Sequence, residues 1–240
     1  MNKKKNSPNR EKVWEMFNKI SSRYDLLNRM LSFGQDIRWR KKVSSYISKD
    51  KKQHLLDLAT GTGDLMLTIV KDNKSVIQAV GLDMADKMLL IGQKKISDSG
   101  LDNKIQMVRG NVENIPFESE SYDIVTIAFG IRNVVDLQKS LNEIFRVTKN
   151  NGQVLILEFS LPSNKFIRKS YLFYFRYILP LIGSVISGDS YAYRYLNETV
   201  ETFPYGEQFC ELMKEVGFNK VKLVPLTFGV ASIYIGEKSK

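Results

Sequence analysis

Residues 55–64 have the sequence Leu55-Leu56-Asp57-Leu58-Ala59-Thr60-Gly61-Thr62-Gly63-Asp64, in which an apolar run leads into two closely spaced glycines. Two glycines directly after a strand allow a tight turn and let a ligand approach the backbone closely. A dinucleotide-binding fingerprint needs a third glycine at position 66, where this chain has Met66. Asp57 and Asp64 also place negative charge near the loop, which a pyrophosphate would oppose. The loop therefore favours an adenosyl ligand with a positive centre and no phosphate, and an ordinary strand-to-helix turn is the alternative.

The segments around this loop alternate apolar runs with helical patterns. Apolar runs predict strands at residues 54–59, 76–82, 105–108, 122–129 and 154–159. Apolar residues at helical spacing predict helices at 64–72, 85–98, 136–148 and 207–216, and two more strands follow at 219–226 and 228–236. The first five strands are apolar throughout, as expected of parallel strands that are buried on both faces. We therefore predict an α/β fold with a mostly parallel sheet and helices on both faces.

Two of these strands end in residues suited to an adenosyl group. Asp83 lies 20 residues after Gly63, at the end of the second strand. A carboxylate there can accept hydrogen bonds from both ribose hydroxyls, and capping of the next helix is the alternative. After the third strand, the side chain of Asn111 and the backbone of Val112 are placed to meet an adenine, although Gly-Asn is also a common turn pair. S-adenosylmethionine, with its sulfonium and α-ammonium groups, fits all of these positions.

Three parts of the chain depart from the alternating pattern. Residues 1–10 are basic and polar with no apolar segment after them, which predicts a disordered tail and no secretory signal. Residues 11–50 have apolar side chains at helical spacing, which predicts a helical N-terminal cap. Residues 161–200 form an insertion rich in tyrosine and aliphatic residues, which predicts a helical lid. We expect residues 11–240 to form a single domain that includes the cap and the lid.

The composition of the 240 residues excludes several kinds of chemistry. With 43% hydrophobic residues the chain can build a substantial core. Cys210 is the only cysteine and His54 the only histidine, so no intrachain disulfide can form and a zinc site of the usual Cys/His type is excluded. A Ser-His-Asp triad or a Cys/His nucleophile would have to use His54, which disfavours both. A di-metal site made only of carboxylates stays open.

The charge is strongly positive, with 36 lysines and arginines against 26 acidic residues and a formal net charge of +10. Such an excess suits an anionic partner such as nucleic acid, a membrane surface or an acidic metabolite, or it reflects only a lysine-rich composition. No stretch has the roughly 18 uninterrupted apolar residues that a membrane span needs. Residues 171–187 come nearest, and Arg176, Pro180 and Gly183 interrupt them. We expect a cytoplasmic protein that is soluble or peripheral to the membrane.

Several separated motifs resemble one family. The first is Tyr24-Asp25-Leu26-Leu27-Asn28-Arg29-Met30-Leu31-Ser32-Phe33-Gly34-Gln35-Asp36-Ile37-Arg38-Trp39. The second is Arg146-Val147-Thr148-Lys149-Asn150-Asn151-Gly152-Gln153-Val154-Leu155-Ile156-Leu157-Glu158-Phe159-Ser160. Residues 129–133 and 190–196 add to the match. Over residues 11–238 the chain resembles the ubiquinone/menaquinone biosynthesis C-methyltransferases, which are class I S-adenosylmethionine-dependent methyltransferases.

The resemblance implies a Rossmann-like class I methyltransferase fold with a mostly parallel seven-stranded sheet and a helical lid insertion. It implies S-adenosyl-L-methionine as the cofactor, bound by Thr62, Asp83, Asn111 and Val112. Asp57 and the glycine loop, with Gly61 and Gly63, would line the methionine part of the cofactor. No metal would be needed.

The resemblance also implies the catalytic residues Arg132, Asn133 and Tyr24, which would face the substrate. The alternatives are a surface salt bridge for Arg132, a helix N-cap for Asn133 and an aromatic plug of the pocket for Tyr24. The reaction would be methylation of a ring carbon of a prenylated quinol, which becomes nucleophilic when the neighbouring hydroxyl ionises. Because arginine stays protonated in proteins, we expect Arg132 to stabilise the phenolate while water carries the proton.

The chain departs from the family where Asp36 replaces a common histidine, Leu27 a methionine and Asn150-Asn151 a Pro-Gly pair. Asp36 and the lysine-rich composition favour demethylmenaquinol, converted to menaquinol, over the benzoquinol of ubiquinone biosynthesis. Three other functions stay open: a different small-molecule methyltransferase, a nicotinamide-dependent oxidoreductase, which Met66 disfavours, and a non-catalytic membrane module. We expect the quinol and the inner face of the membrane as partners, no nucleic acid, and leave a homodimer open.

Overall fold

The computed structural model describes residues 10–178, 181 and 190–239 of the 240 residues. Most of the expected tail, residues 1–9, and the middle of the expected lid, residues 179–180 and 182–189, lie outside the described residues.

A seven-stranded sheet organises the chain, in the order β3-β2-β1-β4-β5-β7-β6. The strands are β1 (Gln53–Leu58), β2 (Val76–Asp83), β3 (Ile105–Arg109), β4 (Tyr122–Ala128), β5 (Thr148–Phe159), β6 (Asn219–Leu226) and β7 (Ala231–Glu237). Strands β1 to β5 are parallel, and β7 runs antiparallel to both β5 and β6. The predicted α/β fold with a mostly parallel sheet is thus confirmed.

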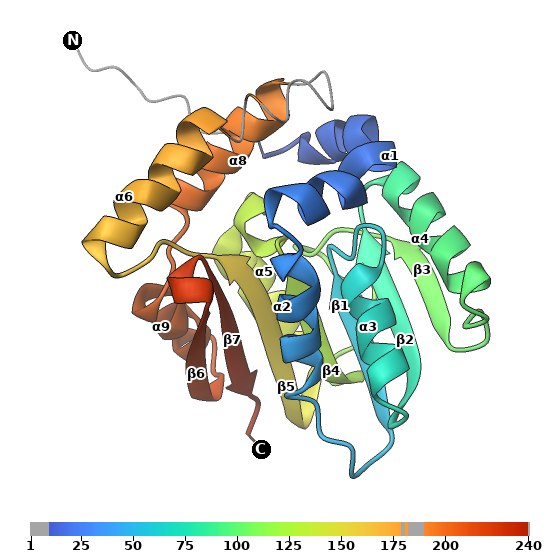
Figure 1. Ribbon diagram of the computed structural model, residues 1–240. Helices are drawn as coiled ribbons and strands as arrows, with labels where there is room; N and C mark the ends of the chain where they lie inside the picture. Colours follow the sequence, from blue (N-terminus) through green and yellow to red (C-terminus); the bar gives the residue numbers. More distant parts are fainter. Residues whose placement is uncertain (1–9, 179–180, 182–189, 240) are drawn as a thin grey trace.

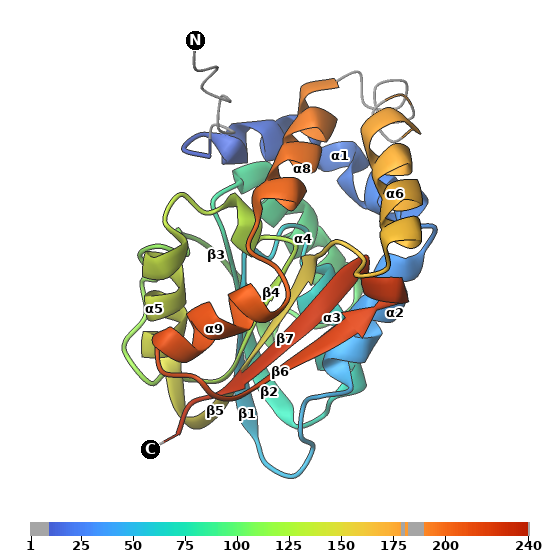
Figure 2. The ribbon, with the colours of Figure 1, turned by 90° about the vertical axis from the view of Figure 1, so that its left-hand side faces the viewer.

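Helices cover both faces of this sheet, because neighbouring residues of a strand point to opposite sides. Leu55 of β1 belongs to a core with α2 (Gln35–Ser44), α3 (Asp64–Asp72) and α4 (Asp86–Asp98). Leu56 belongs to a second core on the other face, with α5 (Leu137–Val147) and α9 (Glu207–Glu215). Figure 2 shows α5 and α9 on one side of the sheet and α2 and α3 on the other.

Three further helices lie across the edge where the parallel strands end (Figure 1): α1 (Val13–Leu31), α6 (Lys165–Phe173) and α8 (Ser190–Thr202). A π-helical segment, η2 (Tyr174–Ile178), continues α6. Helix α1 of the expected cap and the helical parts of the lid therefore lie over the carboxyl edge of the sheet (Figure 1), where open α/β sheets bind their ligands, whereas α2 of the expected cap covers a face of the sheet. No helix among the described residues is both long and apolar enough to cross a membrane.

Two predicted boundaries were wrong. Strand β5 begins at Thr148 rather than at residue 154, because pairing with β4 (Thr148 opposite Tyr122) extends it through polar residues. The last strand begins at Ala231 rather than at residue 228, because a short turn, η3 (Thr227–Gly229), comes first. Apolarity predicts where a strand is buried, and hydrogen bonding to neighbours determines how far it extends.

Candidate functional site

Two cavities lie beneath the cap and meet at shared aromatic residues. The larger has a volume of about 400 Å³ and the smaller about 290 Å³. Both are lined by Phe17, Tyr24 and Phe129. Tyr24 of α1 packs edge to face on Phe17, with ring centroids 5.9 Å apart. The shared residues show that the two cavities are adjacent.

The smaller cavity is lined by groups from the ends of four strands. Gly61 follows β1, Asp83 ends β2, Asn111 and Val112 follow β3, and Gly130 follows β4. Ligands in open α/β sheets bind where the loops of neighbouring strands diverge in this way. The structure thus brings together four of the seven expected cofactor residues: Gly61, Asp83, Asn111 and Val112.

Asp83 is held in place by two backbone amides. Its carboxylate accepts hydrogen bonds from the amide of Gly61 (2.8 Å) and from the amide of Ala85 (2.8 Å). Burial raises the pKa of Asp83, and these backbone hydrogen bonds oppose the shift. The alternative as a helix N-cap is wrong, because Ala85 is the N-cap of α4 and no side chain caps it; Asp83 instead holds the turn before α4. Each carboxylate oxygen retains lone-pair capacity for a further donor in the cavity.

Three other expected cofactor residues lie outside both cavities. Asp57 is buried and accepts hydrogen bonds from the hydroxyls of Thr60 and Thr126, both at 2.6 Å. Burial raises its pKa to about 6, against the opposing effect of these hydroxyls. Gly63 has φ +78° and forms the N-cap of α3. Asp57 and Gly63 therefore support the glycine loop without lining either cavity.

Thr62, the third expected cofactor residue outside both cavities, is hydrogen-bonded to helix α1. Its hydroxyl donates to Asp25 of α1 (2.6 Å) and accepts from the ammonium group of Lys95 (2.9 Å). Lys95 also bridges Asp25 and Asp64, both at 2.6 Å. This cation neutralises the charge of Asp64 that we expected to repel a pyrophosphate. The sequence could not indicate the contact, because Asp25 lies 37 residues away from Thr62.

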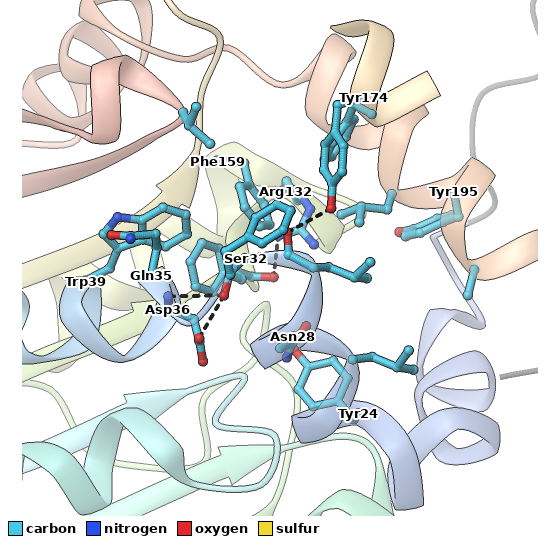
Figure 3. A pocket seen from close by; sticks show the side chains of 18 of the residues that line it. Tyr24, Asn28, Ser32, Gln35, Asp36, Trp39, Arg132, Phe159, Tyr174 and Tyr195 are labelled. Carbon is cyan, nitrogen blue, oxygen red and sulfur yellow. Dashed lines mark hydrogen bonds between the residues drawn. The ribbon is translucent and has the colours of Figure 1, made fainter. Parts of the chain in front are cut away.

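The larger cavity has aromatic walls. Trp39, Phe129 and Phe159 form a cluster in which the rings of Phe129 and Phe159 lie 4.5 Å apart. The indole of Trp39 donates to the hydroxyl of Thr227 (2.9 Å), which ties α2 to η3. Figure 3 shows these walls and the polar groups of Tyr24, Asn28, Asp36 and Arg132 among them. An apolar space with few polar groups suits a large hydrophobic molecule with a polar ring.

Arg132 is one of two buried arginines that line the larger cavity, and the other, Arg40, is paired with Asp36. Nη1 of Arg132 donates to Glu158 Oε1 (2.7 Å) and to the carbonyl oxygen of Phe129 (2.5 Å). Glu158 is fully buried, and it also accepts from the backbone amides of Arg132 and Phe159. Burial raises the pKa of Glu158, and Arg132 opposes the shift. The alternative of a surface salt bridge is therefore wrong, because the bridge that forms is internal.

Two buried polar atoms of this cavity have no hydrogen-bond partner among the described residues: Nε of Arg132 and the hydroxyl of Tyr171. Buried polar groups are almost always hydrogen-bonded in native proteins, so these two atoms need an explanation. Burial raises the pKa of Tyr171, so its hydroxyl stays protonated. A ligand with hydroxyl groups would satisfy both atoms.

Asn133 follows Arg132 but lines the smaller cavity. Both residues belong to η1 (Ile131–Asn133), a 3₁₀ turn in which successive side chains diverge by about 120°. The expectation that Asn133 shares a cavity with Arg132 is thus not met. Its buried Oδ1 has no partner among the described residues. The alternative as a helix N-cap is also wrong, because Asp136 caps α5 by accepting from the amide of Lys139.

Tyr24 stands between the cavities with its hydroxyl protonated. Burial raises its pKa, and Asn28 and Arg132 oppose the shift. A protonated phenol can donate a hydrogen bond but cannot serve as a base at neutral pH.

Asp36 lines the larger cavity but is already paired. Its carboxylate accepts from Arg40 (2.5 Å) and from the hydroxyl of Ser32 (2.8 Å). Burial acts to raise the pKa of Asp36, but Ser32, Arg40 and Arg29 together hold it below the ordinary value. Asp36 is therefore a charged anchor of α2.

Sequence reasoning missed Glu158, Tyr171 and Trp39 as members of the site. For Glu158 a signal existed, since it is the one acidic residue within the otherwise apolar run Leu155-Ile156-Leu157-Glu158-Phe159. A carboxylate in a buried strand needs a partner. Tyr171 gave no individual signal among the tyrosines of the insertion.

The strand order, the antiparallel β7 and the cavity at the carboxyl edge are those of a class I S-adenosylmethionine-dependent methyltransferase. The chain belongs to the ubiE/COQ5 methyltransferase family, whose model matches residues 4–238.

Two curated relatives and one solved structure illustrate the similarity. The chain is 43% identical over 228 residues to "Ubiquinone/menaquinone biosynthesis C-methyltransferase UbiE" of Geobacter sulfurreducens, covering 95% of this chain and 89% of the relative. It is 42% identical over 223 residues to "Demethylmenaquinone methyltransferase" of Thermus thermophilus, covering 93% and 100%. The structure of a SAM-dependent methyltransferase from Thermotoga maritima is similar in fold, with a TM-score of 0.65, 17% identity, and coverage of 94% and 100%.

Proposed function

We propose that this protein transfers a methyl group from S-adenosylmethionine to a ring carbon of demethylmenaquinol and so forms menaquinol. The observation that carries the proposal is the pair of cavities that share Tyr24 and Phe129. One has a carboxylate at the end of β2, and the other has aromatic walls and a buried arginine. Such a pair suits an adenosyl cofactor beside a prenylated aromatic ring.

The smaller cavity fits the cofactor. Asp83 would accept from the ribose hydroxyls, Asn111 and Val112 would contact the adenine, and Gly61 would let the chain pass close to the ligand. The orphaned Oδ1 of Asn133 offers an acceptor in the same cavity. When bound, S-adenosylmethionine supplies a methyl group on a positively charged sulfur. Asp57, Thr62 and Gly63 would support the loop rather than touch the ligand.

The larger cavity would hold and activate the quinol. The aromatic walls exclude water, and Arg132 would stabilise the phenolate that makes the ring carbon nucleophilic. Glu158 accepts a hydrogen bond from Nη1 of Arg132 and so holds the guanidinium in place. Nε, which has no partner among the described residues, would then donate a hydrogen bond to the substrate. Tyr171 and Tyr24 would donate hydrogen bonds to the ring oxygens. The shared wall supports the proposal because two ligands in adjacent cavities would lie close to each other, as methyl transfer needs.

The name of the Thermus thermophilus relative supports demethylmenaquinol as the substrate, and the name of the Geobacter sulfurreducens relative covers both quinone types. The benzoquinol of ubiquinone biosynthesis is therefore the second candidate. A prenylated substrate resides in the membrane, so we propose that the protein works at the membrane surface. The net charge of +10 supports attraction to anionic lipid.

The role of Arg132 is tested by Arg132→Ala. We expect turnover of reduced demethylmenaquinol to fall by roughly 10² to 10³, the range found when one transition-state donor is removed. The dissociation constant for S-adenosylmethionine, measured by calorimetry, should stay nearly unchanged because Arg132 lines only the larger cavity. Arg132→Lys is the matched variant that keeps the charge. Equal losses in turnover and in cofactor affinity would contradict the proposed role.

A further inference from the structure

We propose that the solvent-exposed side of α6 and η2 docks on an anionic lipid bilayer, and that this helix is the wall through which the prenyl chain reaches the larger cavity. The inference rests on the proposed function and names the surface through which it operates. The docking surface, called the aromatic face below, consists of Phe166, Phe173 and Tyr177.

Among the described residues, the aromatic face is apolar and exposed. Phe166, Phe173 and Tyr177 are 79%, 58% and 62% exposed. They are seven and four residues apart, which places them along one side of a helix. The rings of Phe173 and Tyr177 lie 5.3 Å apart. None of the residues of α6 is buried. A folded protein rarely leaves three large aromatic side chains in water along one helix unless they have a partner.

The positive charges beside the aromatic face favour a negatively charged partner. Lys165 and Lys169 belong to the same helix and are exposed. Residues 159–178 contain four lysines and arginines and no acidic residue, and one of the four, Arg176, is paired with Glu201 of α8. An amphipathic helix with aromatic groups on one side and lysines beside them is the pattern of helices that lie in the interface of an anionic membrane. A second copy of this chain would need acidic side chains to pair with these cations. The same segment of the second copy, residues 159–178, contains none.

The opposite side of the same helix lines the larger cavity. Tyr171, Tyr174 and Phe175 contribute to its wall, so α6 and η2 separate the cavity from the proposed bilayer. Phe33, at the turn between α1 and α2, packs on Tyr174 at 5.9 Å and also lines the cavity while remaining 78% exposed. It has φ +51°, a conformation that bulky residues rarely adopt. Phe33 therefore marks the rim at which the cavity meets the docking surface.

The test compares vesicle binding of the full-length chain and its variants. Sedimentation with vesicles of equal parts phosphatidylcholine and phosphatidylglycerol should show Phe166→Ser/Phe173→Ser binding at least about tenfold more weakly than the original protein. The matched control is Leu90→Ser, an equally exposed apolar residue of α4 at the other end of the sheet. Lys165→Gln/Lys169→Gln should bind more weakly to these vesicles and equally to pure phosphatidylcholine.

Activity separates docking from folding. With a tail-less, water-soluble quinol, the Phe166→Ser/Phe173→Ser variant should turn over as fast as the original protein, because neither residue lines a cavity. With long-chain quinol in vesicles it should turn over more slowly.

Unchanged vesicle binding of this variant would overturn the inference. So would a concentration-dependent dimer of the original protein that the same variant dissociates, since a second copy would then be the occupant. If the original protein methylates no quinol at all, the proposed function fails while the vesicle result still decides the docking surface.

Discussion

At the scale of the residue, the buried pair of Arg132 and Glu158 is the most consequential feature of the site. Isolated charges are costly to bury, and this pair is accompanied by backbone groups that use the remaining capacity of the carboxylate. The Arg132 side chain also lies over the ring of Phe159, 5.3 Å from its centroid. The arginine is thus held from two sides, which makes Glu158 a positioning residue for it.

Glu158→Ala should lower the free energy of unfolding by about 3–5 kcal/mol, because it leaves the Arg132 charge buried without its partner. Urea unfolding followed by circular dichroism measures this loss. The control is Glu211→Gln, which removes an exposed pair with Lys214 and should cost less than about 1 kcal/mol. A double variant, Glu158→Leu/Arg132→Met, should regain most of the lost stability. If Glu158→Ala were as stable as the control, the pair would not have the role assigned to it.

Asp57 predicts a dependence of stability on pH. Its pKa is 3.8 in an unfolded chain and about 6 in the folded protein, so the folded state binds this proton more tightly. The stability it contributes is fully present below pH 3.8 and is lost as the pH rises through about 6. Relative to Asp57→Asn, the original protein should therefore lose up to roughly 3 kcal/mol of unfolding free energy across this window. The free energy of unfolding of both proteins is measured at several pH values. If it changed with pH in the same way for the two proteins, the raised pKa of Asp57 would be contradicted.

At the scale of the element, α1 closes the site from above. Trp14, Phe17 and Tyr24 of this helix line the smaller cavity, and Asp25 ties the helix to Lys95 and Thr62. Helix α1 and the glycine loop are therefore held together, and both line the smaller cavity. The periodicity of residues 11–50 predicted that this segment is helical, and neither the position of α1 nor its tie to the loop was predictable from it.

Asp25→Asn should weaken S-adenosylmethionine binding roughly fivefold, because a partly exposed ion pair is worth up to about 1 kcal/mol. Amide hydrogen exchange of α1 should accelerate in the same variant. The matched control is Glu15→Gln, which removes an exposed pair with Lys12 on the same helix and should leave both measurements unchanged. Equal cofactor affinity of the two variants would show that the tie does not help to close the cavity.

At the scale of the whole molecule, the sequence predicted the architecture well because buried parallel strands and amphipathic helices leave clear patterns. The run of residues 55–58 and the glycines after it were enough to locate β1 and the start of α3. The predicted strand 219–226 matches β6 in both boundaries.

The site was predictable only where local sequence carries the chemistry. Asp83 is recognisable because it ends a strand at a fixed distance from a glycine loop. The cavity that Asn133 lines and the partners of Thr62 could not be predicted, because a 3₁₀ turn and a contact with α1 decide where their side chains point. Glu158 went unassigned because its partner, Arg132, lies 26 residues away.

The most direct test of the account is methyl transfer itself. Purified protein, S-adenosylmethionine and reduced demethylmenaquinol should yield menaquinol methylated on the ring carbon, identified by mass spectrometry and proton NMR. Arg132→Ala should give little product under the same conditions. Absence of transfer to either a naphthoquinol or a benzoquinol, or transfer to a hydroxyl oxygen instead of the ring carbon, would contradict the account.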